Sequence, residues 1–159
     1  MDDLPVPTGH RYVRAHKEIH VTSLDAKPSA ASVMVRTLIA AIAAILVNNL
    51  YSVGYTAITG FSLPEIINPI SVTIFSAVPV LLGGIVYLIA SRFRVSVARW
   101  GLVGGTVVLF VLLAFPSFAD TIQTPAGASM PAPEGFAGLS FGLHFAGPIF
   151  LLWLVPRSR

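Results

Sequence analysis

Apolar stretches alternate with short polar segments along this chain after a polar start of 32 residues. Four stretches can be drawn, at 33–54, 69–91, 97–116 and 138–156. A helix needs roughly 20 apolar residues to cross a hydrocarbon core of about 30 Å. Each stretch reaches that length, and none has an Asp or Glu in its middle. The pattern therefore predicts an all-α fold, an integral membrane four-helix bundle that occupies 33–156.

The segments outside these spans predict the remaining organisation. Residues 1–32 form a polar N-terminal arm. Asn68-Pro69 predicts the start of the second span, because an N-cap residue precedes a proline at the first helical position. The loop 117–137 is the one long connection, and its prolines and alanines argue against regular structure. Its apolar side chains favour a segment that lies on the outer face of the membrane.

The basic residues are confined to alternate segments of the chain. All ten lie in the N-terminal segment and its junction, in the second connection or in the C-terminal tail: Arg11, Arg14, Lys17, Lys27, Arg36, Arg92, Arg94, Arg99, Arg157 and Arg159. The first and third connections carry only Glu65, Asp120 and Glu134. The positive-inside rule then predicts that both termini are cytoplasmic. We expect a multi-pass protein of a bacterial inner membrane, with Trp100 and Trp153 at the cytoplasmic interface.

Composition excludes several classes of protein. A hydrophobic fraction of 55%, a charged fraction of 11% and a mean hydropathy of +0.80 fit no soluble domain of this size. The net charge of +3 sits where anionic lipid headgroups lie, which makes membrane lipids the expected partner and nucleic acid an unexpected one. Because cysteine is absent, disulfides, thiol catalysis and iron–sulfur ligation are excluded.

Polar residues inside the spans are the candidate functional residues. Those chosen as site residues are Asn48, Asn49, Ser76 and His144. At 1.5 Å per helical residue, Asn48 and His144 lie about 9 Å below the outer ends of their spans, and Ser76 lies about 12 Å below. Three different helices therefore place polar side chains in one layer of the outer half of the membrane.

This layer supports three interpretations. It can be structural, with His144 hydrogen-bonded to Asn48 or Asn49 and Ser76 nearby. It can be the site of a ligand-binding or transport module that opens to the outer face, with 117–137 as its gate. It can also place His144 as the axial ligand of a haem or chlorophyll-type pigment, since the small residues Ser140, Gly142 and Gly147 leave room for a flat ring.

Other patterns carry less chemistry. Pairs of small residues four apart predict close helix packing within the chain: Ala40 and Ala44, Gly101 and Gly105, Gly138 and Gly142. His16 and His20 have the spacing of a helical metal site but lack a third ligand, so no metal site is predicted. No catalytic set is found at a credible depth, and we expect no enzyme and no resident cofactor.

The order of three motifs resembles a known family. An Asn-bearing first helix at 43–51, a proline-containing second helix, and Gly142-Leu143-His144-Phe145-Ala146 in the last helix are similar to an uncharacterised family of small bacterial four-helix membrane proteins, known only as a domain of unknown function. The resemblance covers 35–155, implies the four-helix bundle and singles out Asn48 and His144. We expect a non-enzymatic structural or accessory subunit that packs against itself or a larger membrane complex.

Overall fold

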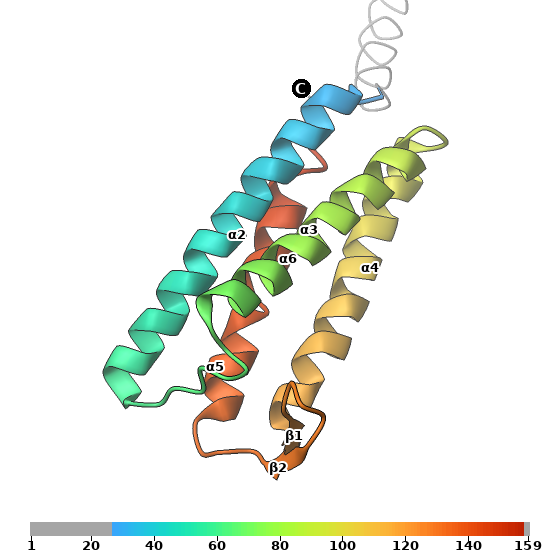
Figure 1. Ribbon diagram of the computed structural model, residues 1–159. Helices are drawn as coiled ribbons and strands as arrows, with labels where there is room; N and C mark the ends of the chain where they lie inside the picture. The colour runs from blue at the N-terminus through green and yellow to red at the C-terminus, as the bar shows by residue number, and fades with distance from the viewer. Residues whose placement is uncertain (1–26, 158–159) are drawn as a thin grey trace, which may run out of the picture.

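Four apolar helical segments account for most of residues 27–157, the part of the chain that the computed structural model describes (Figure 1). They are α2, Ala30–Thr59; α3, Pro69–Ser91; α4, Val95–Ala114, which continues into the 3-10 turn η1, Phe115–Phe118; and α5, Phe136–Leu143, followed by α6, Ala146–Leu154. All four segments are long and apolar enough to cross a membrane. The prediction of an all-α fold is confirmed, and the four candidate spans indicate a multi-pass membrane protein. Most of the predicted arm lies outside the described residues.

Local capping signals decide where two of the helices begin and end. The side-chain oxygen of Asn68 accepts hydrogen bonds from the amides of Ile70 and Ser71, at 3.1 and 3.0 Å, and the Ser71 hydroxyl accepts one from the Asn68 amide at 2.9 Å. This capping box starts α3 at the predicted residue. α2 is longer than the predicted 33–54, because it continues through Gly54 to Thr59, where the C-cap residue Gly60 with its left-handed φ of 72° ends it.

Small residues let α2 pack closely against its neighbours. Ala40 and Ala44 are both fully buried, with 0% of their surface exposed. A Cβ atom added to Gly142 would collide with the ring of Tyr51, and Gly138 makes a similar approach to a second tyrosine of α2. The predicted close packing is confirmed for the pairs Ala40–Ala44 and Gly138–Gly142.

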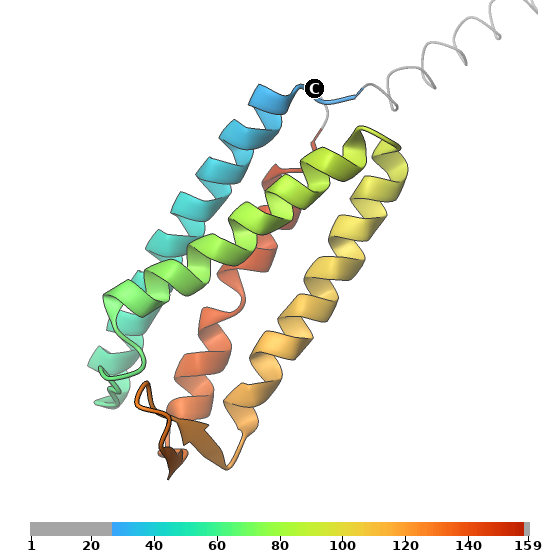
Figure 2. The same ribbon diagram turned by 45° about the vertical axis from the view of Figure 1, so that its right-hand side comes forward.

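α4 is the least enclosed of the four segments. It packs on α3 and more weakly on α6, and α3 and α4 diverge from their short connection (Figure 2). A Cβ atom added to Gly101 or Gly105 would meet no other atom within 4 Å. The prediction that Gly101 and Gly105 pack against another helix of the chain is therefore wrong, because no other helix of the described residues lies close to α4 at these two residues.

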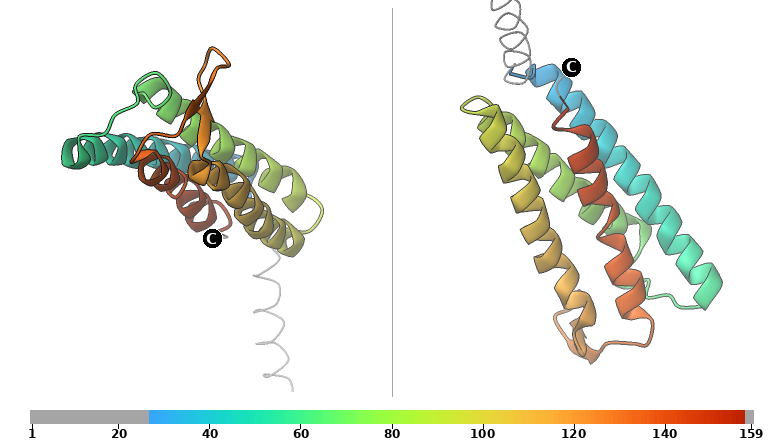
Figure 3. Two further views of the ribbon diagram at one scale, coloured as in Figure 1. Left: turned by 90° about the horizontal axis from the view of Figure 1, so that it is seen from below. Right: turned by 180° about the vertical axis from the view of Figure 1, so that it is seen from behind.

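The long connection after η1 contains a β-hairpin, so the prediction of no regular structure at 117–137 is wrong. β1, Thr121–Gln123, pairs antiparallel with β2, Ser129–Pro131, and Ile122 lies opposite Met130. Gly127, with a φ of 80°, makes the tight turn possible. Ile122 is 7% exposed, so its side chain is buried against the rest of the molecule, although the tip of the hairpin projects beyond the helices (Figure 3, left).

The described charges gather at two opposite ends of the molecule. Lys27, Arg36, Arg92, Arg94, Arg99 and Arg157 lie at the end where α2 begins, α3 meets α4 and α6 stops. Glu65, Asp120 and Glu134 lie at the other end, in the α2–α3 connection and beside the hairpin (Figure 1). The Lys27 ammonium donates to the Arg92 carbonyl at 2.8 Å, which ties the start of the described chain to the α3–α4 connection.

Candidate functional site

The fourth apolar segment is broken in its middle, where one continuous helix at 138–156 was predicted. α5 ends at Leu143, and α6 begins at Ala146, nearly in line with it (Figure 2). The amides of His144 and Phe145 bond to carbonyls only three residues back, at 3.1 and 3.3 Å. Pro148 has no amide hydrogen to donate, so in a regular helix the carbonyl of His144, four residues earlier, would lack its usual partner. The break therefore leaves backbone groups that need other partners.

Asn48 of α2 supplies one of these partners. Its Nδ2 atom donates to the carbonyl of Leu143 and to the hydroxyl of Ser76, both at 2.8 Å. In an unbroken helix that carbonyl would accept from the amide of Gly147. Asn48 is 3% exposed, and its two bonds join α2, α3 and the end of α5. Backbone that is not helical is tolerated at membrane depth only where such bonds or a cavity satisfy it.

The structure brings together three of the four predicted residues, but with different bonds. The predicted hydrogen bond from Asn48 or Asn49 to the His144 side chain is wrong, because the helix break presents the neighbouring backbone carbonyl to α2 instead. Asn49 stands apart from the layer: it donates to the carbonyl of Ile45 in its own helix at 2.9 Å and to the Thr73 hydroxyl at 3.4 Å.

The imidazole of His144 is oriented by its own helix. Its Nδ1 atom lies 2.7 Å from the carbonyl oxygen of Ser140. Since a carbonyl oxygen only accepts, Nδ1 carries the hydrogen and donates it. In the neutral ring the other nitrogen, Nε2, then keeps its lone pair for a further partner.

A cavity of about 950 Å³ lies against the break, between the diverging helices α3 and α4. Its walls are mostly apolar and include side chains of α3, α4 and α6. The polar groups that line it are few and come from separate elements: Asn48, Ser71, Ser76, Thr106, Ser117, Thr121, Gln123, Ser140 and His144. Thr121, Ile122 and Gln123 of β1 also line the cavity, and they belong to the segment 117–137 that was predicted as a gate.

Three of the lining residues retain hydrogen-bonding capacity. Both bonds of Asn48 use Nδ2, so its oxygen Oδ1 has no partner among residues 27–157. Thr106 is 7% exposed, and its hydroxyl likewise makes no hydrogen bond in the described part of the chain. With His144 Nε2, the cavity therefore offers acceptors on α2, α4 and the broken helix. Thr106 was not among the predicted site residues, although a hydroxyl inside an otherwise apolar span was the signal for it.

The space that the pigment interpretation needs is partly filled. The ring of Tyr51 lies directly against Gly142, and its hydroxyl donates to the Gly138 carbonyl at 2.8 Å. Gly147 is buried against Val80. His144 could still present Nε2 to a metal, but the flat ring would have to lie on the cavity side of the helix. Within residues 27–157, no three His, Asp or Glu side chains gather to hold a metal ion, and His16 and His20 lie outside the described residues.

No protein-family model, no curated protein and no solved structure matches this chain. The resemblance to a family of small bacterial four-helix membrane proteins stays a prediction.

Proposed function

We propose that this protein is a membrane-embedded binding or transport module for a lipophilic molecule that carries a hydrogen-bond donor. The apolar body of the ligand lies in the cavity between α3 and α4. Its donor, such as a hydroxyl or an amide, reaches the acceptors on Asn48, Thr106 and His144. The observation that carries the proposal is the broken helix, which presents polar groups to an otherwise apolar cavity inside the membrane layer.

The size and shape of the cavity support this class of ligand. About 950 Å³ is at the upper end of the range for small-molecule sites, which are mostly apolar with a few placed polar groups. Side chains of α3 that line the cavity are also exposed on the outside of the molecule, among them Phe75, Leu82 and Val86. A lipophilic molecule can therefore enter sideways from the lipid. Broken helices at midmembrane depth also form the substrate sites of many transporters.

A second candidate function uses the same opening. The expected accessory subunit would let a helix of a partner, or of a second copy, cover the gap between α3 and α4. The exposed glycines Gly101 and Gly105 favour this candidate, because small residues allow helices to approach closely. In either case we propose a bacterial inner membrane with both termini in the cytoplasm, supported by the absence of Lys and Arg from the first and third connections.

Filling the cavity tests both candidates. Gly105→Trp would place an indole in the cavity without a backbone clash, because a Cβ atom there meets nothing within 4 Å. Gly104→Trp is the matched control: its Cβ atom also meets nothing, but Gly104 does not line the cavity. The full chain would be purified in mild detergent, and its organic extract analysed by mass spectrometry.

We expect wild type and Gly104→Trp to carry a lipophilic compound at stoichiometric amounts, and Gly105→Trp to lose it while it remains folded. Equal retention of bound compounds in the two variants would contradict the binding proposal. If Gly105→Trp instead loses a co-purifying polypeptide, or changes from oligomer to monomer, the accessory function is favoured and the ligand proposal fails.

A further inference from the structure

Three arginines, two in helices and one just after the last helix, line one hollow at the basic end of the molecule. Arg36 lies in the second turn of α2, Arg99 in the second turn of α4, and Arg157 follows the end of α6. The hollow has a volume of about 1050 Å³ and is separate from the cavity that contains Asn48 and His144. Residues more than 120 positions apart in the sequence therefore present guanidinium groups to one place.

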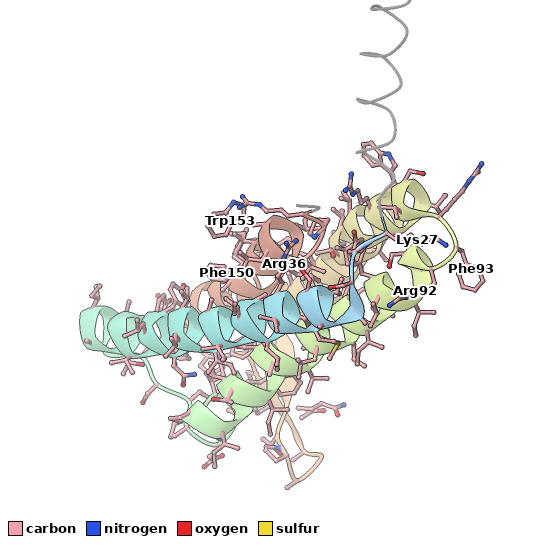
Figure 4. The ribbon with its side chains drawn as sticks, turned by 90° about the horizontal axis from the view of Figure 1, so that it is seen from above. Lys27, Arg36, Arg92, Phe93, Phe150 and Trp153 are labelled. Atoms are coloured by element: carbon pink, nitrogen blue, oxygen red, sulfur yellow. The ribbon has the colours of Figure 1, made fainter. Side chains whose placement is uncertain are left out.

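Aromatic and apolar side chains complete the hollow. The guanidinium carbon of Arg157 lies 4.7 Å from the ring centroid of Trp153, a cation–π contact that holds this arginine at the rim. Viewed from above, Arg36 and Trp153 lie on the same side of the molecule, whereas Lys27 and Arg92 lie by the α3–α4 connection (Figure 4). Val35 and Val103 form apolar walls, and they are 55% and 38% exposed.

We propose that this hollow binds the headgroup of an anionic phospholipid from the leaflet at the basic end. Guanidinium groups match phosphate oxygens with two parallel hydrogen bonds, which makes arginine well suited to phosphate recognition. Basic pockets between membrane helices bind such headgroups on the cytoplasmic side. Among the described residues that line the hollow three are arginines and none is acidic, so their charge favours an anion here.

The apolar walls identify the source of the phosphate. A free phosphate ion would use the arginines only and would gain nothing from Val35, Val103 and the face of Trp153. The acyl chains of a phospholipid continue from the headgroup along these side chains, in the direction of the membrane interior. The site is independent of the function proposed above, because it shares no lining residue with the other cavity.

Lipid binding to the purified full chain tests the proposal. Native mass spectrometry would be used to titrate palmitoyl-oleoyl phosphatidylglycerol, phosphatidylcholine with the same chains, and inorganic phosphate. Arg36→Gln removes one guanidinium of the site, and Arg92→Gln removes one from the same end outside the hollow. Arg157→Gln is a second site variant, and we expect the helices to stay folded in it because residue 157 lies beyond the end of α6.

We expect phosphatidylglycerol to bind at least about tenfold more tightly than phosphatidylcholine, and each site variant to lose about tenfold in that affinity, the loss of one charge-assisted hydrogen bond. Arg92→Gln should change it by less than about twofold, as expected for an exposed charge. Equal effects of Arg36→Gln and Arg92→Gln would mean that only diffuse charge attracts the lipid, and the proposal would fail. It would also fail if the two lipids bound equally, or if inorganic phosphate competed as well as the lipid did.

Discussion

The hydrogen bonds of Asn48 lead to a quantitative prediction for the variant Asn48→Leu. Leucine is similar in size but removes both bonds from Nδ2, one to Ser76 and one to the carbonyl of Leu143. An interhelical hydrogen bond in a membrane contributes about 0.6 kcal/mol on average. The carbonyl of Leu143 would in addition lose its partner, and an unsatisfied buried acceptor costs about 1–3 kcal/mol. We therefore expect the free energy of unfolding to fall by about 2–4 kcal/mol.

Asn49→Leu is the matched control for this prediction. Asn49 is the next residue of α2, but its bonds go to the carbonyl of Ile45, which also has a backbone partner in the helix, and to Thr73 at a long 3.4 Å. Its replacement should cost less than about 1 kcal/mol. Unfolding would be followed by circular dichroism while dodecyl sulfate is titrated into mixed micelles. If Asn49→Leu destabilised the protein as much as Asn48→Leu, the inference that Asn48 stabilises the helix break would be refuted.

A double-mutant cycle separates the partners of Asn48. Asn48→Leu combined with Ser76→Ala should show a coupling energy of about 0.6 kcal/mol, because the two side chains share a hydrogen bond. Asn48→Leu combined with His144→Leu should show a smaller coupling, since the imidazole bonds to the Ser140 carbonyl rather than to Asn48. A larger coupling to His144 than to Ser76 would contradict the geometry.

Two further predictions concern orientation and the role of the imidazole. A reporter that is active only in the cytoplasm should give signal when fused after residue 95 or 159 and none after residue 60 or 128, because the first and third connections carry none of the ten Lys and Arg residues; signal at residue 128 would overturn the four-span topology. His144→Gln should stay folded, with a loss of less than about 1 kcal/mol, because glutamine keeps a donor for the Ser140 carbonyl. The purified protein should be colourless, and a visible absorption band that disappears in the folded variant would instead establish the pigment interpretation.

Local rules predicted much of the fold from the sequence. The four spans follow from the length and apolar composition of their own stretches, which do not depend on contacts with other segments. The start of α3 follows from Asn68, whose capping bonds lie within three residues. The position of the described Lys and Arg residues at one end likewise needed only the order of segments along the chain. The predicted layer of Asn48, Ser76 and His144 was found because helical rise alone gives their depth.

The chemistry within that layer could not be predicted in the same way. Which face of each helix turns inward, and how far α3 and α4 diverge, depends on packing among segments distant in sequence. Gly101 and Gly105 have the same spacing as Gly138 and Gly142, yet only the second pair has a tyrosine-bearing helix against it. Because no described helix packs against α4 at Gly101 and Gly105, a cavity remains there, and Thr106 lies in its wall.

Two prolines show which features the sequence determined and which the tertiary structure decided. By itself the sequence determined that Pro79 and Pro148 each remove one backbone donor from an apolar span. α3 nevertheless continues through Pro79, whereas the fourth span breaks before Pro148. Only the tertiary structure decided this, because the break can persist in a membrane only where another helix satisfies the exposed backbone, and Asn48 lies opposite the carbonyl of Leu143.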